Sequence, residues 1–419
     1  MVTACVSAVE GTSTITADSA VVSISSESTE CPPREGEPAG PSVTAQTILE
    51  SDEVVVRAAV YPHPGYEGNP WSQWGRGVLV RDGRFLSTIG DHLGRDGNSY
   101  FYEFHPESSR LTLVGDILSV VEHQEGNWGY GKIHGALVRD DCLVYAATYW
   151  GTRRDIEFEG TYRGDHLLQW DPADHRIRSL GVPVEGQGIP SLKGFDPGNL
   201  VYGEALQPDD QATTFFVYDV AAGTVSFTST EAGHVGFRDI MVGADGAAYF
   251  SGGEARLIVH RPGESEVETH PHQLPGVWLR ASTEAAPDGS VYGVTREPDQ
   301  FFAMSPSGEF RDLGPSNAYV ASLALDAERG RLYYVPHAHG GAWEEGAPII
   351  AVDTETGDRE TLVELEQAAE DHLGLRLGGS YNTVYDASSR RLYIGMNAGP
   401  LDEEEESFGE VVLLIVDLP

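Results

Sequence analysis

AspGlySerValTyr at 288–292 is one copy of a short phrase that decides the fold of this chain. The phrase is a turn rich in Asp, Gly, Asn or Arg, followed by a hydrophobic strand that carries an aromatic residue. Related copies stand at 82–86, 141–145, 198–202, 245–249, 329–333 and 389–393. The copies number seven, and their aromatic ends lie 41 to 60 residues apart. A repeat of this period is typical of the blades of a β-propeller.

A second apolar strand follows each copy and often ends in an Asp-containing turn, as in PhePheValTyrAsp at 215–219. Strands joined by tight turns at this spacing predict an all-β chain with little room for helices. Each repeat then supplies four strands, from strand A at the centre of the ring to strand D at its edge. The one helix that we expect, Glu364–Leu373, is an insertion in blade six.

The two ends of the repeat region indicate how the ring closes. The last repeat stops at Pro419, directly after its strand C. The segment 53–61, GluValValValArgAlaAlaValTyr, has no other partner, and we predict that it forms the missing outer strand. Closing the ring in this way removes the exposed edge that an open sheet would leave. The sequence therefore predicts a seven-bladed β-propeller over residues 46–419, closed by an N-terminal strand.

Residues 1–45 are rich in Ser, Thr, Glu and Pro and lack hydrophobic periodicity, so we expect a disordered stalk. ValThrAlaCys at 2–5 resembles the lipobox of lipoproteins, in which the cysteine becomes lipid-modified. This match predicts a membrane tether through Cys5 and an extracellular or cell-surface location; the alternative is a chance match. Cys142 lies in an apolar stretch, where we expect an inert core thiol.

The charge of the chain is strongly negative. Asp and Glu number 65 against 27 Lys and Arg, which gives a net charge of -38. Such a surface repels nucleic acid, which excludes that class of partner. Only Lys132 and Lys193 are lysines. The composition resembles that of proteins from extreme halophiles, in which hydrated carboxylates resist salting-out; the alternative is a merely acidic protein. We expect a monomer.

The candidate binding face follows from the propeller geometry. The starts of the inner strands and the loops between strands B and C meet on one face around the central channel, the default ligand site. Lys132 and His134 stand two residues apart, so their side chains point the same way on a strand. Cationic and aromatic groups on an acidic protein favour an anionic or sugar-like ligand, although each could instead pack between blades. The predicted substrate-binding residues are Lys132, Trp128, Trp150, Arg76, Arg280 and Tyr381.

ValProHisAlaHisGlyGly at 335–341 places His337 and His339 on one side of an extended segment. Two imidazoles at this spacing can share a divalent metal if other blades supply further ligands, so the pair is the candidate metal site. The chain contains no GxSxG elbow, P-loop or HExxH helix.

Four motifs extend this reading: LysIleHisGly at 132–135, ThrTyrTrpGlyThrArg at 148–153, the stretch 162–172, and 335–341. Through them the chain resembles a group of secreted bacterial propeller proteins without a firm function, over roughly residues 75–419. More distantly it resembles propeller polysaccharide lyases of the ulvan lyase and oligogalacturonate lyase types. The oligogalacturonate enzymes hold a metal partly through a His-x-His pair, a role that this resemblance implies for His337 and His339. Their Gln three residues before the pair is Tyr334 here.

Two functions follow as hypotheses. The first is a lyase that cleaves an acidic polysaccharide by β-elimination, with His134 as base, Tyr149 as acid, and Arg153 or Arg238 neutralising the uronate carboxylate. The second is a non-catalytic module that binds a glycan or a protein at the cell surface through the same face. Propellers host both, so the fold alone does not separate them.

Overall fold

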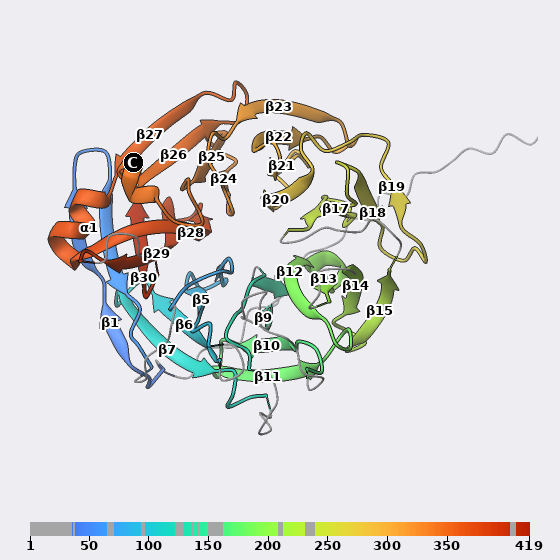
Figure 1. Ribbon diagram of the computed structural model, residues 1–419, viewed down its shortest axis with the longest axis horizontal. Coiled ribbons are helices and arrows are strands. Elements are labelled where there is room, and N and C mark those ends of the chain that lie inside the picture. The colour runs from blue at the N-terminus through green and yellow to red at the C-terminus, as the bar shows by residue number, and fades with distance from the viewer. Residues whose placement is uncertain are drawn as a thin grey trace, which may run out of the picture. The chain divides into compact units, whose positions relative to one another are not determined.

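The computed structural model describes residues 36, 38–64, 71–93, 97–121, 129–135, 137–140, 142–149, 162–207, 213–230, 239–402 and 408–419. Over this part of the chain, seven antiparallel sheets are arranged in a ring about a central channel (Figure 1). Each copy of the repeated phrase runs into the second strand of one sheet, as predicted. The prediction of a seven-bladed β-propeller is therefore confirmed.

The blades follow one another in chain order, each with its innermost strand first. Blade one contains β4 (Val78–Leu79), β5 (Phe85–Gly90), β6 (Ser99–His105) and β7 (Arg110–Asp116). Blade two contains β8 (Val138–Asp140), β9 (Leu143–Ala147), β10 (Leu167–Asp171) and β11 (Arg176–Gly181). Blade three contains β12 (Gly188–Phe195), β13 (Leu200–Leu206), β14 (Thr213–Asp219) and β15 (Thr224–Ser229). Blade four contains β16 (Met241–Val242), β17 (Ala248–Ser251), β18 (Leu257–His260) and β19 (Glu268–Thr269).

The remaining blades complete the ring. Blade five contains β20 (Trp278–Ser282), β21 (Val291–Arg296), β22 (Gln300–Met304) and β23 (Phe310–Pro315). Blade six contains β24 (Ala324–Asp326), β25 (Arg331–Tyr334), β26 (Pro348–Asp353) and β27 (Arg359–Glu364). Blade seven contains β28 (Leu375–Asp386), β29 (Arg391–Pro400), β30 (Glu410–Asp417) and β3 (Val55–Val60). The helix α1 (Glu366–Leu373) connects β27 to β28, which confirms the expected helix.

The ring closes as the sequence predicts. Strand β3 pairs antiparallel with β30, with Val55 opposite Asp417 and Val60 opposite Val412. Two further strands were not predicted: β2 (Gln46–Glu50) extends blade seven beyond β3, and β1 (Ser42–Thr44) pairs with β7 of blade one. The ordered body therefore begins by residue 42, inside the segment that the sequence assigns to the stalk.

The hydrophobic core lies between neighbouring blades. Phe101 of β6 and Trp170 of β10 are both buried, and their rings meet edge to face with centroids 5.1 Å apart. Aromatic residues of the repeated phrase, such as Tyr145 and Tyr202, are fully buried in the same way. Because one sheet cannot bury its own apolar faces, each blade depends on the next for its stability.

Cys142 corrects one expectation. It lies half-buried in the turn between β8 and β9 and is disulfide-bonded, with a partner outside the described residues. The prediction of an inert core thiol is wrong, because a turn position leaves the thiol accessible to another segment of the chain. Cys5 and its lipobox also fall outside the described residues. Where the chain is described, no helix has the length and apolarity needed to cross a membrane.

Candidate functional site

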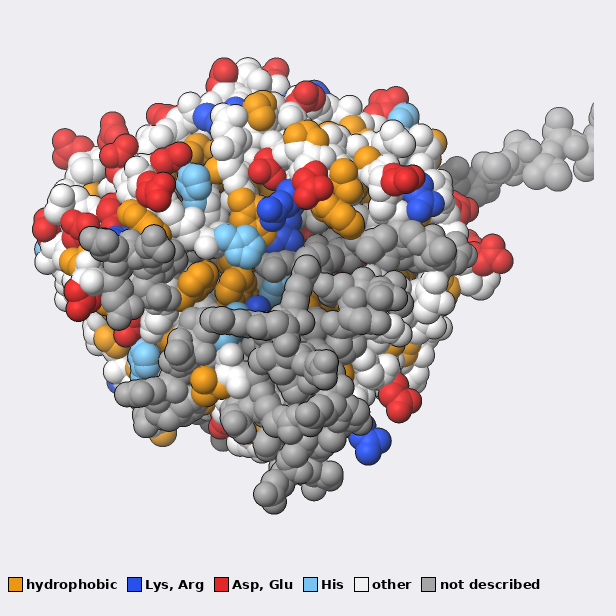
Figure 2. Space-filling view, in the orientation of Figure 1, with side chains coloured by type: hydrophobic (Ala, Val, Ile, Leu, Met, Phe, Trp, Pro, Cys, Tyr) orange, Lys and Arg blue, Asp and Glu red, His pale blue; other side chains and the backbone are white. Residues whose placement is uncertain are grey.

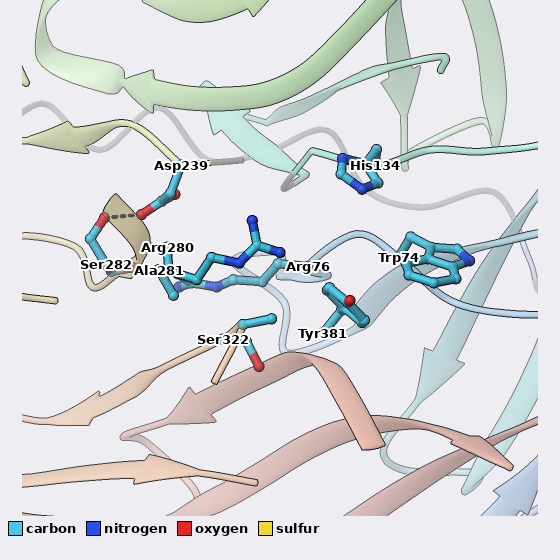
Figure 3. A pocket seen from close by; sticks show the side chains of 10 residues that line it. Trp74, Arg76, His134, Asp239, Arg280, Ala281, Ser282, Ser322 and Tyr381 are labelled. Atoms are coloured by element: carbon cyan, nitrogen blue, oxygen red, sulfur yellow. Dashed lines mark hydrogen bonds between the residues drawn. The ribbon is translucent and has the colours of Figure 1, made fainter. Parts of the chain in front are cut away.

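The candidate site lies at the channel mouth where the inner strands begin. Trp74 and Arg76 precede β4, His134 precedes β8, Arg280 belongs to β20 and Tyr381 to β28. These side chains, from four blades, line one small cavity of about 30 Å³ (Figure 3). The fold thus brings together residues separated by up to 307 positions in the chain (381 minus 74).

His134 is positioned by its neighbours in blades two and three. Its side chain is buried, and its ring stacks on that of Tyr149 with centroids 4.9 Å apart. The Tyr149 N–H donates to the carbonyl of Lys132 at 2.8 Å, which joins the two segments. His134 Nδ1 lies 3.3 Å from the carbonyl oxygen of Pro190. A carbonyl only accepts, so this contact puts the proton on Nδ1 of the neutral ring and makes Nε2 its basic nitrogen.

Trp74 is the aromatic centre of the mouth. Its ring lies 6.4 Å from that of His134, 5.8 Å from His339 and 5.0 Å from Tyr381. The ammonium of Lys132 stands over the same ring, 4.1 Å from its centroid. The rings of His92 and Phe408 also stack on the half-buried indole, with centroids 5.1 and 5.5 Å away, so Trp74 organises the mouth by packing the surrounding rings and Lys132 together.

A buried polar group forms the floor beneath the mouth. The carbonyl of Ser282 accepts hydrogen bonds from Arg76 at 3.0 Å and from Lys193 at 3.3 Å, and its hydroxyl donates to Asp239 at 2.5 Å. Burial raises the pKa of Asp239, although Lys193 opposes this shift. Lys193 also pairs with Glu284 at 3.4 Å. These contacts tie blades one, three, four and five together across the channel.

Lys193 itself lies deeper than Lys132. It lines a separate cavity of about 740 Å³ at the other end of the inner strands. Although burial opposes ionisation of Glu284 in this region, Lys193 and Arg76 hold the pKa of that carboxyl below its usual range. The sequence analysis did not predict Asp239 or Ser282 as site residues. The position of Asp239, directly before an apolar inner strand, is the sequence feature that could have indicated it.

A fully buried carboxyl lies on the blade-three wall. Glu204 of β13 stands opposite Ser191 of β12 in the strand ladder and has no exposed surface. Burial raises its pKa to about 8, a shift that Ser191 opposes and the nearby Asp239 reinforces. Glu204 is therefore mostly protonated near neutral pH.

Basic groups gather at the mouth of this acidic protein. Figure 2 shows Lys, Arg and His side chains near the middle of the drawn face, with most carboxylates nearer its edge. Arg280 and Arg296 both stand over the ring of Tyr319, with guanidinium carbons 4.7 and 4.6 Å from its centroid. Such a concentration of positive charge favours an anionic ligand.

The two histidines of the predicted metal site have different surroundings. His337 Nε2 lies 3.2 Å from a carboxylate oxygen of Glu345, in the short 3-10 helix Ala342–Glu345. His339 stacks on Tyr319 with centroids 4.8 Å apart. Within the described ranges, no group of three or more His, Cys, Asp or Glu side chains is placed to hold a metal. A metal at this pair stays a prediction without a third ligand.

The remaining predicted residues divide into two groups. His134, Lys132, Tyr149, Arg76, Arg280 and Tyr381 lie around the mouth as described above. The other four lie outside the described residues, and they are Trp128, Trp150, Arg153 and Arg238.

Comparison with known proteins supports the fold. No protein-family model and no curated protein matches this sequence. A streptogramin B lyase structure is similar at a TM-score of 0.54 and 10% identity, over 86% of this chain and 97% of that one. A catalytically inactive virginiamycin B lyase from Staphylococcus aureus, crystallised with quinupristin, is similar at a TM-score of 0.53 and 10% identity, over 86% of this chain and 99% of that one. The WD40 repeats of RRP9 are similar at a TM-score of 0.52 and 10% identity, over 90% of this chain and 100% of that one. At this identity the likeness shows a shared propeller fold.

Proposed function

We propose that the channel mouth binds an acidic polysaccharide and cleaves it by β-elimination. The observation that carries the proposal is that His134, Arg280 and Tyr381, from three blades, line one cavity. A base, a cation for a carboxylate and a hydroxyl acid are the groups that this reaction requires. Two structural neighbours are named as lyases, so this fold is compatible with lyase chemistry.

Each residue then has a role. Arg280 neutralises the uronate carboxylate, which lowers the pKa of the adjacent C–H. His134 Nε2 takes that proton, the electron pair forms the C=C bond, and the C–O bond to the next sugar breaks. Tyr381 gives its proton to the departing oxygen, and exchange with water restores both groups. Tyr149, the acid expected from the sequence, stacks face to face on His134 and so positions the imidazole.

Binding without catalysis is the second candidate. The specific observation in its favour is the small size of the cavity, about 30 Å³, which does not enclose a sugar ring. A glycan would then rest on the basic groups of the rim. The WD40 repeats among the structural neighbours show that the same architecture is not confined to lyases.

The test is turnover of a panel of uronate polysaccharides, namely polygalacturonate, alginate, hyaluronan and chondroitin, followed by the ultraviolet absorbance of the unsaturated product. On the substrate that is cleaved, His134→Ala should lower kcat at least about a hundredfold, because a proton acceptor is lost. The matched control is His272→Ala, an exposed histidine of the loop after β19. Unchanged turnover in His134→Ala would refute the assignment of the base. Binding of these polymers without turnover by the unmodified protein would instead establish the second candidate.

The disulfide of Cys142 supports a location outside the cytoplasm for this activity. Disulfides persist in oxidising compartments and are rare in the cytosol. A surface or secreted position is also where a polysaccharide would be met. Fractionation of the producing cells checks this location.

A further inference from the structure

The ring of Tyr319 carries two arginines on the rim of the mouth. The guanidinium carbons of Arg280 and Arg296 lie 4.7 and 4.6 Å from its centroid, and His339 stacks on the same ring at an interplanar angle of 14°. Arg296 is the last residue of β21, and its backbone lies opposite Trp278 in the ladder with β20. The sheet therefore holds both arginines beside one aromatic surface.

Arg296 brings an exposed positive charge to this pair. The Arg296 side chain is exposed and makes no hydrogen bond or ion pair with any residue that the structure describes. Asp299 acts electrostatically on both arginines, and burial raises the pKa of its carboxyl despite them. Two cations within 5 Å of one ring centroid repel each other, and an anion that contacts both relieves that repulsion.

A continuous row of rings leads from this pair to the proposed base. Tyr319 stacks on His339, His339 lies 5.8 Å from Trp74, and Trp74 lies 6.4 Å from His134. Tyr381 flanks the row, 6.4 Å from Tyr319 and 5.0 Å from Trp74. Arg280 lines the same cavity as His134, so the row leads outward from this cavity to Arg296 at the end of β21.

We propose that Arg280 and Arg296 on Tyr319 form a subsite for the acidic group of a sugar beyond the one that is cleaved. This inference rests on the proposed function and narrows its substrate class to polymers with carboxylate or sulfate groups on more than one sugar. Guanidinium groups suit both oxyanions, since each offers a planar pair of N–H donors. Arg280 then contacts the acidic groups at both the mouth and the subsite, whereas Arg296 contacts only the acidic group at the subsite.

The experiment uses Arg296→Gln, which removes charge from an exposed side chain and leaves the ladder intact. On the polymer that is cleaved, KM should rise about tenfold, or ~1.4 kcal/mol, with kcat unchanged. Arg296→Lys should recover only part of the loss, because an ammonium lacks the planar donor pair. The control is Arg311→Gln in β23 of the same blade, whose guanidinium donates to the carbonyls of Thr354 and Glu355.

Binding is measured separately in the His134→Ala background, by calorimetry with polygalacturonate, chondroitin, chondroitin sulfate and neutral dextran at fixed salt. Weaker binding of polygalacturonate and chondroitin on adding Arg296→Gln supports a carboxylate subsite. Loss confined to chondroitin sulfate supports a sulfate subsite. Equal affinity and equal KM with and without Arg296 would overturn the subsite while leaving the lyase proposal intact. Arginine-dependent binding with no turnover by the unmodified protein would overturn the lyase proposal alone.

Discussion

Glu204 is a carboxyl whose protonation is strongly changed by folding. Its side chain is fully buried in β13, and burial raises its pKa from 4.5 to about 8. The unfolded chain therefore loses this proton at a lower pH than the folded chain does. Between these two values the folded state binds more protons, so the free energy of unfolding falls as pH rises.

Glu204→Gln should accordingly flatten the pH dependence of stability. The unmodified protein is expected to lose up to about 1.4 kcal/mol per pH unit through this group between pH 4.5 and about 8, and no more above that window. Urea unfolding of both proteins across this range measures the difference. Glu328→Gln, at an exposed turn position, controls for the general effect of removing one carboxylate. Parallel curves for Glu204→Gln and the unmodified protein would show that Glu204 does not titrate in this way.

At the scale of elements, the N-terminal strands join the two ends of the ring. Strand β3 pairs with β30. Ala59 of β3 and Tyr61, which follows it, are buried against blade one, where the Tyr61 hydroxyl meets that of Ser87 at 2.7 Å. Arg57 bonds Asp417 of blade seven and the Ser109 hydroxyl of blade one. Strands β1 and β2 repeat this arrangement farther out, one on each blade. The N-terminal segment thus holds together the first and last blades.

Shortened chains test this closure. A chain that starts at Ser42 keeps β1, β2 and β3, one that starts at Glu53 keeps β3 alone, and one that starts at His63 keeps none. All three lack Cys5 and Cys31, so each retains only Cys142 and they can be compared directly. The chain from Glu53 should melt several degrees below the chain from Ser42, and the chain from His63 should fail to give a cooperative transition. Equal melting temperatures for the first two would show that β1 and β2 add nothing to closure.

For the whole molecule, the excess of carboxylates is the dominant physical property. A net charge of -38 produces repulsion that opposes the compact state, and salt screens it. A halophilic origin for this acidity stays a prediction. It is independent of the site, since the basic groups at the mouth are few against 65 acidic residues.

Molar KCl should therefore raise the melting temperature well above its value in dilute buffer. Thermal scans across a KCl series measure the effect, and sodium sulfate at matched ionic strength separates screening from the general stabilisation by excluded salts. Similar gains in both salts at low ionic strength indicate screening of the carboxylates. A flat response would show that the acidity does not weaken the fold in dilute buffer.

Local pattern was enough for the ring, its seven blades, the helix α1 and the closing strand β3, because strand period, turn residues and an unpartnered segment are properties of neighbouring residues. It was also enough to place His134 and Arg280 near the starts of inner strands, whereas Tyr381 lies in the middle of the long strand β28. Only the tertiary structure decided that Tyr149 stacks on His134 while Tyr381 lines the cavity, that Lys193 lies below Ser282, and that β1 and β2 join two blades. Alternation along a strand says which side chains share a face, but contacts between blades depend on how the ring closes and packs.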